Sequence, residues 1–431
     1  MTRSIRNFLA THNLLAVSAQ KREVAMNTEQ DLDTTMLVDL NTVLNYQAVK
    51  TSNKDVATGK EEADQLYDFG GKVVGTLTFS RAQPQHFAFL LGYGLGTVTT
   101  GALGASGFKH TIQPLAGELD AAQSNPSFTA AMRFGRQVMK RRFASCFIDQ
   151  VRMDFAKDGW AKISGTVKGS GKVVDNTYME EVAATDNVTS LTLAANGVAG
   201  ETAAELLSNV QAVQVLNSTT QAWEEVAYQT VSATTPASIT ITAPGATGDN
   251  TTYRVYYVPD ESGWMDLPAR VEEPPLKVSQ LNVTLGGRWD GTSFQGGYPL
   301  TSELRGVTWT LKNNLTPEST PGAGGSYANR AYRTGRDQTL KFDRDFRDFL
   351  LAQNLKDNDT LGVYLKATGP ELAPGVNYQV ELVFPRVAVT GTTVKVYQRR
   401  LGEEVNFAVL EDDTYGSVLA YVQNQVSGYV A

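Results

Sequence analysis

Cysteine is nearly absent from this 431-residue chain, which contains a single one, Cys146. One cysteine cannot form a disulfide within the chain, and this scarcity is typical of proteins made in a reducing cytoplasm. Cys146 lies among apolar neighbours in the stretch Phe143–Asp149. We therefore expect it to be buried as a small hydrophobic side chain and not to act as a nucleophile.

Histidine is also scarce, and the three histidines are scattered at His12, His86 and His110. None has a partner at metal-ligand spacing, which excludes the usual zinc motifs. We expect His86 to be packed in or on a helix, and His110 to lie at the edge of a strand. No Gly-x-Ser-x-Gly motif occurs to indicate a hydrolase nucleophile.

Acidic pairs and glycine-rich stretches are present, but none has the spacing of a known site. The pairs Asp31 with Asp33, Glu403 with Glu404, and the run Glu411–Asp413 do not match a calcium loop, and we expect them to lie on solvated faces. Gly92–Gly96 and Gly101–Gly104 do not match a phosphate-binding loop, and we expect a loop after a helix, capped by glycine. The sequence therefore predicts no catalytic, cofactor-binding or metal site, no cofactor and no enzymatic activity.

Basic charge does not predominate. Lysine and arginine total 38 against 45 aspartates and glutamates, which gives a net charge of −7. This balance lacks the electrostatic footprint of a protein that grips nucleic acid. The basic run Lys140–Arg142, with Arg133 and Arg136 nearby, is expected to form ion pairs or a contact between subunits.

Long apolar runs are missing, since none reaches the about 20 residues that a membrane-spanning helix needs. The N-terminal stretch Thr2–Val24 mixes basic and apolar residues without the compact apolar core and cleavage site of a signal peptide. An organellar transit peptide would have a similar composition. We favour an N-terminal arm, residues 1–29, that packs on a neighbour.

Alternation of apolar and polar residues is what the sequence has in abundance. Val73–Phe79, Ser238–Thr242, Tyr253–Val258 and Thr392–Tyr397 all show the period of two that predicts half-buried antiparallel strands. Helices are expected at 84–91, 345–353 and 203–208. In the second of these, Phe346, Phe349 and Leu350 would share one face. The stretch Phe128–Phe143 fits either structure, and the Gly- and Pro-rich stretch Thr316–Arg330 is expected to be a loop that is mobile or ordered only by a neighbour.

Two segments resemble each other. Thr76–Arg81 and Thr339–Arg344 both read Thr-Leu-x-Phe-x-Arg, and an apolar helical stretch follows each. Strands Phe147–Phe155 and Trp160–Gly165 follow in the first half. Tyr378–Phe384, Val387–Val389 and Val394–Tyr397 are expected as successive strands in the second. This pattern predicts an internal duplication of residues 30–175 and 276–431.

The segment between the copies, residues 178–264, is rich in Ala, Thr and Asn. Five short strands are expected in it, at 190–193, 210–215, 225–228, 238–242 and 253–258, which are enough for a small inserted β-sandwich. Stretches 260–263 and 272–275 are expected to be the return linker. Tyr253, Tyr256 and Tyr257 are the one candidate aromatic platform, although packing within the domain explains them equally well.

The order of these features resembles the tail tube proteins of siphophages, the long-tailed bacteriophages. The resemblance rests on the strand and helix at Leu77–Leu91, the Gly-rich stretch after it, and the strand Pro126–Met132. It continues through Arg142–Cys146, the strands Ile148–Phe155 and Ala161–Val167, and Val307–Pro317 with its Asn-Asn-Leu-x-Pro ending. Together these cover about residues 30–175 and 276–425.

The resemblance implies a mostly β fold: two tail-tube-like β-sandwich or barrel modules, each with one short helix, plus an inserted small β-sandwich (immunoglobulin-like) domain. It implies a structural virion protein, assembled in the host cytoplasm, that forms stacked rings of the tail tube, a conduit for DNA. Partners would be further copies of the chain, a tape-measure protein, and tail terminator and distal tail proteins. DNA would pass a neutral or acidic lumen without specific binding, and no membrane would be involved.

Copy number follows from the duplication. The family's ring has six modules, so two modules per chain predict a homotrimeric ring with pseudo-sixfold symmetry. The alternatives are a distal tail or baseplate hub protein, a carbohydrate-binding adhesin, and a β-rich hydrolase that uses carboxylates.

Overall fold

A computed structural model describes residues 9–104, 106–115, 125–134, 139–156, 159–232, 236–244, 251–260, 267–300, 302–320 and 326–431. Strands predominate throughout this part of the chain, which also contains three α-helices. The predicted mostly β fold is confirmed. The chain forms two compact units, and each is described by itself.

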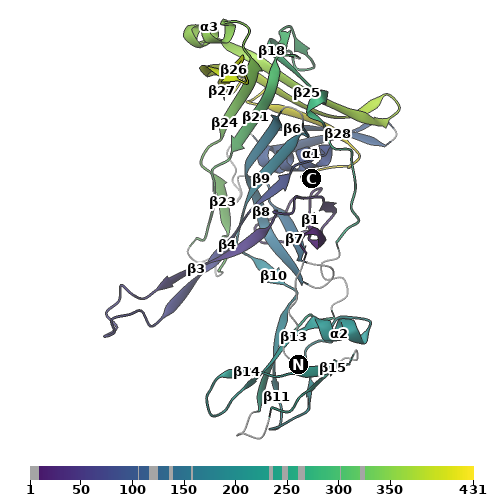
Figure 1. The fold of residues 1–431 in the computed structure, drawn as a ribbon, viewed down its shortest axis with the longest axis vertical. Coiled ribbons are helices and arrows are strands. Elements are labelled where there is room, and N and C mark those ends of the chain that lie inside the picture. The colour runs from purple at the N-terminus through teal and green to yellow at the C-terminus, as the bar shows by residue number, and fades with distance from the viewer. Residues whose placement is uncertain are drawn as a thin grey trace. The chain divides into compact units, whose positions relative to one another are not determined.

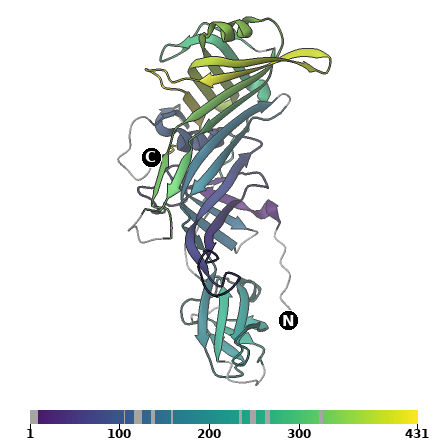
Figure 2. The same cartoon turned by 90° about the vertical axis from the view of Figure 1, so that its left-hand side faces the viewer.

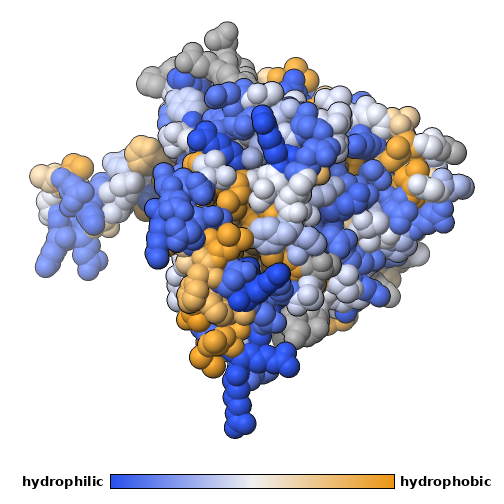
Figure 3. Space-filling model, turned by 90° about the horizontal axis from the view of Figure 1, so that it is seen from above, coloured by the Kyte–Doolittle hydropathy of each residue, from blue (hydrophilic) through white to orange (hydrophobic). Residues whose placement is uncertain are grey.

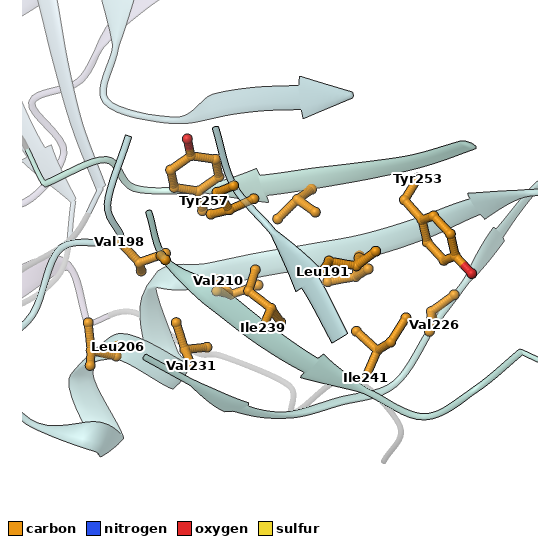
Figure 4. Close-up of a cluster of buried hydrophobic side chains, with 14 of the residues drawn as sticks. Leu191, Val198, Leu206, Val210, Val226, Val231, Ile239, Ile241, Tyr253 and Tyr257 are labelled. Carbon is orange, nitrogen blue, oxygen red and sulfur yellow. The ribbon is translucent and has the colours of Figure 1, made fainter. Parts of the chain in front are cut away.

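The smaller unit comprises residues 1–14, 131–142 and 174–266. Its four-stranded sheet contains β11 (Tyr178–Ala183), β17 (Thr252–Tyr257), β13 (Val210–Leu216) and β14 (Trp223–Glu225). Its three-stranded sheet contains β12 (Ser190–Thr192), β16 (Ser238–Ile241) and β15 (Tyr228–Val231). Both sheets contribute to one core, in which Leu191, Ile239, Val210 and Tyr253 are buried (Figure 4).

Two details of this unit differ from the prediction. The expected strand at 225–228 is divided, because β14 ends at Glu225 and β15 begins at Tyr228. Strand β11 was not expected. It is mostly exposed and lies at a sheet edge against β17, so its sequence has little apolar signal. Helix α2 (Ala203–Asn209) lies where it was predicted, and Thr202 caps it by accepting a hydrogen bond from the Glu205 amide.

The larger unit comprises residues 15–130, 143–173 and 267–431. Eight of its strands pair side by side, all antiparallel, in what we call the first sheet (Figure 1). In order of pairing they are β3 (Leu44–Ser52), β4 (Leu66–Phe79), β9 (Lys162–Gly169), β8 (Met139–Ala156), β21 (Leu304–Lys312), β24 (Asp337–Asp345), β27 (Arg400–Val409) and β26 (Val376–Tyr397).

The second sheet of this unit shares the long strand β26 with the first. Its order is β20 (Tyr298–Pro299), β18 (Leu281–Trp289), β25 (Thr360–Ala373), β26, β28 (Leu419–Asn424), β6 (Gly107–Pro114) and β5 (Gly96–Leu103). Figure 2 shows the second-half strands β25 to β28, in yellow-green and yellow, gathered at one end of the unit. Since β28 pairs with β6, this sheet too contains strands from both halves of the chain.

Helix α1 (Pro84–Leu95) is completely buried and packs against strands of both sheets. Proline at its first position and left-handed Gly96 at its C-cap (φ 104°) set its ends. The predicted loop at Gly92–Gly96 is therefore wrong, because the helix continues through Gly92 and Gly94. A Cβ atom on Gly94 would lie 2.8 Å from the Val151 side chain, so only glycine allows this close approach.

Helix α3 (Leu350–Asp357) begins later than predicted, because Asp345 still belongs to β24. Phe349 is its N-cap residue, and Leu351 is its one buried residue. The predicted apolar face of Phe346, Phe349 and Leu350 therefore does not face the core of this unit. Leu351 has that position instead.

Two further predictions need correction, and one ambiguous stretch is resolved. The three expected strands between Tyr378 and Tyr397 are one continuous strand, β26, and the strand that follows it is β27. The ambiguous stretch Phe128–Phe143 contains β7 (Phe128–Phe134) and the start of β8. The stretch 316–330, predicted to be a loop, contains most of β22 (Leu315–Glu318) and the first residue of β23 (Arg330–Arg333), which pair with each other. Residues 261–266 and 321–325 lie outside the described residues.

The two halves of the chain share an order of strand pairing. In the first, β1 (Leu14–Val17) pairs with β2 (Thr34–Met36) and β7, β3 pairs with β4, and β9 pairs with β4 and β8. In the second, β18 pairs with β20 and β25, β21 pairs with β24, and β27 pairs with β24 and β26. Helices α1 and α3 follow the matched strands β4 and β24.

Candidate assembly surfaces

The two halves join edge to edge through β8 and β21. Their register runs from Gly306 opposite Ala156 to Lys312 opposite Gln150. Trp309 lies opposite Met153 in this join and is fully buried. Just beyond it, the Asn313 side-chain amide donates to the Ile148 carbonyl oxygen at 3.0 Å. The join is therefore a packed, hydrogen-bonded strand pair with the character of a sheet interior.

A second join, between β28 and β6, surrounds His110. Its ring nitrogens lie 2.9 Å from the Thr100 hydroxyl and 3.0 Å from the Asn424 side-chain oxygen. The predicted position at a strand edge is wrong, because β6 has β5 on one side and β28 on the other. Burial lowers the pKa of His110, so the ring is neutral at pH 7.

The first sheet has two unlike ends. At one end β3, whose one pairing among the described strands is with β4, forms with it the extended arm labelled in Figure 1. Most of its apolar side chains are exposed: Tyr46, Val49, Val56, Leu66, Tyr67 and Phe69. An isolated two-stranded hairpin with exposed apolar groups is marginally stable in water, so this arm is suited to a partner.

At the other end, the hairpin of β26 and β27 extends beyond its core, close to α3 (Figure 1). Five exposed apolar side chains, which we call the apolar edge patch, come from these elements: Phe349, Leu350, Val394, Val396 and Leu401. Val396 lies opposite Leu401 in the strand pair, so the two side chains share one face of the hairpin. Figure 3 looks onto this end of the molecule and shows hydrophobic surface gathered among polar residues.

A buried ion pair lies next to this patch. Arg344, the last residue of the second Thr-Leu-x-Phe-x-Arg motif, is 1% exposed. Its Nε donates to the Glu403 carboxylate at 2.8 Å, and its Nη2 lies 2.7 Å from the same carboxylate oxygen. Glu403 is therefore not the solvated acid that the sequence suggested. Its neighbour Glu404 contacts Lys341 at 2.8 Å, which with Lys395 holds the pKa of Glu404 well below its usual range.

A second buried carboxylate, Glu273, links the segment that enters the second half to two other elements. One oxygen accepts from the Gln85 amide in the first turn of α1 at 2.7 Å, and the other accepts from the Gln425 amide at 3.1 Å. Burial outweighs these hydrogen bonds and raises the pKa of Glu273 to about 7. The stretch 272–275 was predicted to be a linker, and within it Glu273 is packed and 3% exposed.

Other residues singled out in the sequence lie apart from one another. Cys146 is fully buried, and burial with the Glu23 charge raises the pKa of its thiol. His86 is stacked on Phe79 with ring centroids 4.0 Å apart, and burial lowers its pKa to about 3. In the basic run, Arg141 is ion-paired with Asp175.

The tyrosine cluster does not form a binding platform. Tyr253 and Tyr257 are fully buried in the core of the smaller unit, whereas Tyr256 lies on the opposite face of β17. Among the described residues no group of three His, Cys, Asp or Glu side chains could hold a metal ion. Within the same residues, no helix is long and apolar enough to cross a membrane.

The chain matches no protein-family model and no curated protein sequence. Among solved structures it is similar to a double mutant of the Hcp1 protein from E. coli EAEC 042 pathovar. That similarity has 12% identity and a TM-score of 0.19, over 33% of this chain and 96% of that one. At this level the similarity supports no conclusion about function.

Proposed function

We propose that this chain is a structural protein whose copies join by strand pairing into stacked rings, the tail tube of a long-tailed bacteriophage. The observation that carries the proposal is the join between β8 and β21. The first sheet consists of two sets of four strands, β3-β4-β9-β8 from the first half and β21-β24-β27-β26 from the second. At the join, the last strand of the first set pairs with the first strand of the second set. The chain thus contains one complete contact of the kind that a ring of repeats would use.

The unlike ends of the first sheet support the same proposal. The last strand of the second set, β26, corresponds to β8, and β3 corresponds to β21. If copies repeat the internal contact, β26 of one copy meets the β3 region of the next. Head-to-tail contacts close into a ring when the rotation from one copy to the next is a whole fraction of a turn. Two repeats per chain and six per ring give three copies, and tethering within each chain favours half of the contacts.

The remaining partners follow from the resemblance to tail tube proteins. A tube of this kind would surround a tape-measure protein, end at terminator and distal tail proteins, and conduct DNA in the virion. The alternative within the same class is a distal tail or baseplate hub protein, which would form one ring but no tube. The adhesin is less well supported, because two of its three candidate platform residues are buried.

Negative-stain microscopy and native mass spectrometry of the purified protein test this proposal. We expect hollow tubes or rings, with a mass of three chains per ring. Single rings that never stack would favour the hub protein. Six chains per ring would refute the repeat argument, and a protein that stays monomeric at high concentration would refute assembly altogether.

Hydrogen exchange gives an independent test of the contact surface. On assembly, amides of the outer edge of β26 at 390–397 and of the β3 region should become protected, since new strand pairs would form there. The join between β8 and β21 is the internal control, because it is already paired in one chain. Unchanged exchange at both ends of the first sheet in assembled rings would contradict pairing there.

A further inference from the structure

The segment that leads into the second half of the chain covers the end of the first half. Leu276 is fully buried, and its amide donates to the Ala82 carbonyl at 3.0 Å. Its carbonyl oxygen accepts from the Ala161 amide at 2.9 Å, and Val278 donates to Gly159 at 3.0 Å. Residues 276–278 therefore close off the end of the β4–β9 strand pair.

The first half of the chain begins with a similar segment. Leu276 is followed by the 3-10 helix η2 (Val278–Gln280) and then by β18. Leu9 is followed by the 3-10 helix η1 (Ala10–His12) and then by β1. Strands β1 and β18 also have matching partners. Strand β1 pairs with β2 and β7, and β18 pairs with β20 and β25. Leu9 thus corresponds to Leu276, yet Leu9 is 62% exposed.

At the corresponding place in the second half the two strand ends pair with each other, since Phe346 donates to the Leu401 carbonyl at 3.1 Å, and apolar side chains beside them are exposed. Asp345 corresponds to Ala82, because each lies three residues after the phenylalanine of its motif, Phe342 or Phe79. These phenylalanines pair with Val405 and Ile163, so residues 401–403 correspond to residues 159–161. This position belongs to the apolar edge patch, where Leu401 is 54% and Phe349 71% exposed. The two helices differ in the same way. Helix α1, beside the covered surface, is wholly buried, whereas α3, beside the exposed patch, has one buried residue.

We propose that Leu9 and η1 of one copy dock on the apolar edge patch of the next copy. The occupant is a second copy of this chain, because the chain itself shows which segment covers the matching surface. The inference rests on the proposed self-assembly and deepens it by naming the contact. It also explains why hydrophobic side chains are exposed at both places, since each would be covered on association.

Cross-linking of mixed single-cysteine variants tests the docking. One population carries Leu9→Cys and the other Val396→Cys, while the native Cys146 is buried and should not react. After assembly of the mixture, a short thiol-reactive cross-linker should give covalent dimers that contain one chain of each kind. The matched control mixes Leu9→Cys with Val24→Cys, whose residue is 86% exposed and outside the patch, and should give few such dimers.

The outcomes separate this inference from the proposed function. Rings without dimers of Leu9→Cys and Val396→Cys chains would overturn the docking and leave assembly intact. Absence of both rings and dimers would overturn both. A Leu9→Asp variant should assemble at least about tenfold more weakly than the wild type, because burial of a leucine side chain favours association by that order. Undiminished assembly of Leu9→Asp would also count against the docking.

Discussion

Glu273 should make the stability of this protein fall as the pH rises from about 5 to about 7. Its folded pKa of about 7 exceeds the ordinary value of 4.5, so the folded chain binds a proton there more tightly than the unfolded chain. Any stability gained from that proton is fully present below pH 4.5 and is lost as the pH rises through 7. The difference in pKa corresponds to ~3 kcal/mol of unfolding free energy.

The two buried histidines act in the opposite direction over part of this range. Burial lowers the pKa values of His86 and His110 below the ordinary 6.5, so their contribution is present above pH 6.5 and is lost as the pH falls. The wild-type profile therefore combines both effects. A comparison with Glu273→Gln isolates the carboxyl group, because the histidines remain in both proteins.

The assay is chemical unfolding of wild type, Glu273→Gln and Glu272→Gln at half-unit steps from pH 5 to 8. The difference in unfolding free energy between wild type and Glu273→Gln should change by ~3 kcal/mol over this range. Its absolute value also includes one lost acceptor, since a glutamine oxygen replaces only one of two carboxylate oxygens. Glu272→Gln is the matched control, because Glu272 is exposed and paired with Arg270. Parallel profiles for wild type and Glu273→Gln would refute the reasoning.

Three further outcomes are expected. Arg344→Ala should lower the unfolding free energy by about 3–5 kcal/mol, because it leaves the buried Glu403 carboxylate unpaired. The control, Arg347→Ala, breaks an exposed ion pair and should lower the unfolding free energy by at most about 1 kcal/mol. Equal effects of the two substitutions in denaturant titrations would contradict this prediction. Replacement of residues 178–264 by a short Gly/Ser bridge should leave assembly intact, and a folded variant that forms no rings would show that the segment is needed. Chelation by EDTA should leave the melting temperature unchanged, and a drop together with bound metal in elemental analysis would contradict the prediction that the chain needs no metal.

Local patterns in the sequence predicted much of the fold. The period of two located strands such as β16 and β17, and Thr-Leu-x-Phe-x-Arg located the ends of β4 and β24. Helix α1 could be predicted because proline begins it and apolar residues fill it. Its end could not, because Gly92 and Gly94 favour a loop locally, and their place in the helix depends on contacts with distant residues such as Val151.

Local sequence patterns could not predict the candidate assembly surfaces. The join between β8 and β21 pairs residues about 150 positions apart in sequence, and no local signal specifies which strand edges meet. The stretch at 272–275 was predicted only as a linker, and no local signal indicated that Glu273 is buried by contacts with α1 and the C-terminal segment. The N-terminal arm was expected to pack on a neighbour. Its similarity to the segment at Leu276 appears only in the strand pairing.

The polar face of the first sheet bears on how DNA would move through the proposed tube. Side chains alternate along each strand, so Val307, Trp309 and Leu311 face the core while Thr308 and Thr310 lie on the other face. On that face lysines lie beside carboxylates: Lys162 opposite Asp154, Lys312 opposite Asp337, and Lys341 and Lys395 in contact with Glu404. DNA is held where lysines neutralise phosphates and release counterions. Lysines that already face carboxylates, among threonines and serines, attract phosphates more weakly than unpaired lysines would. A face of this composition as the lumen wall would let DNA pass without gripping it.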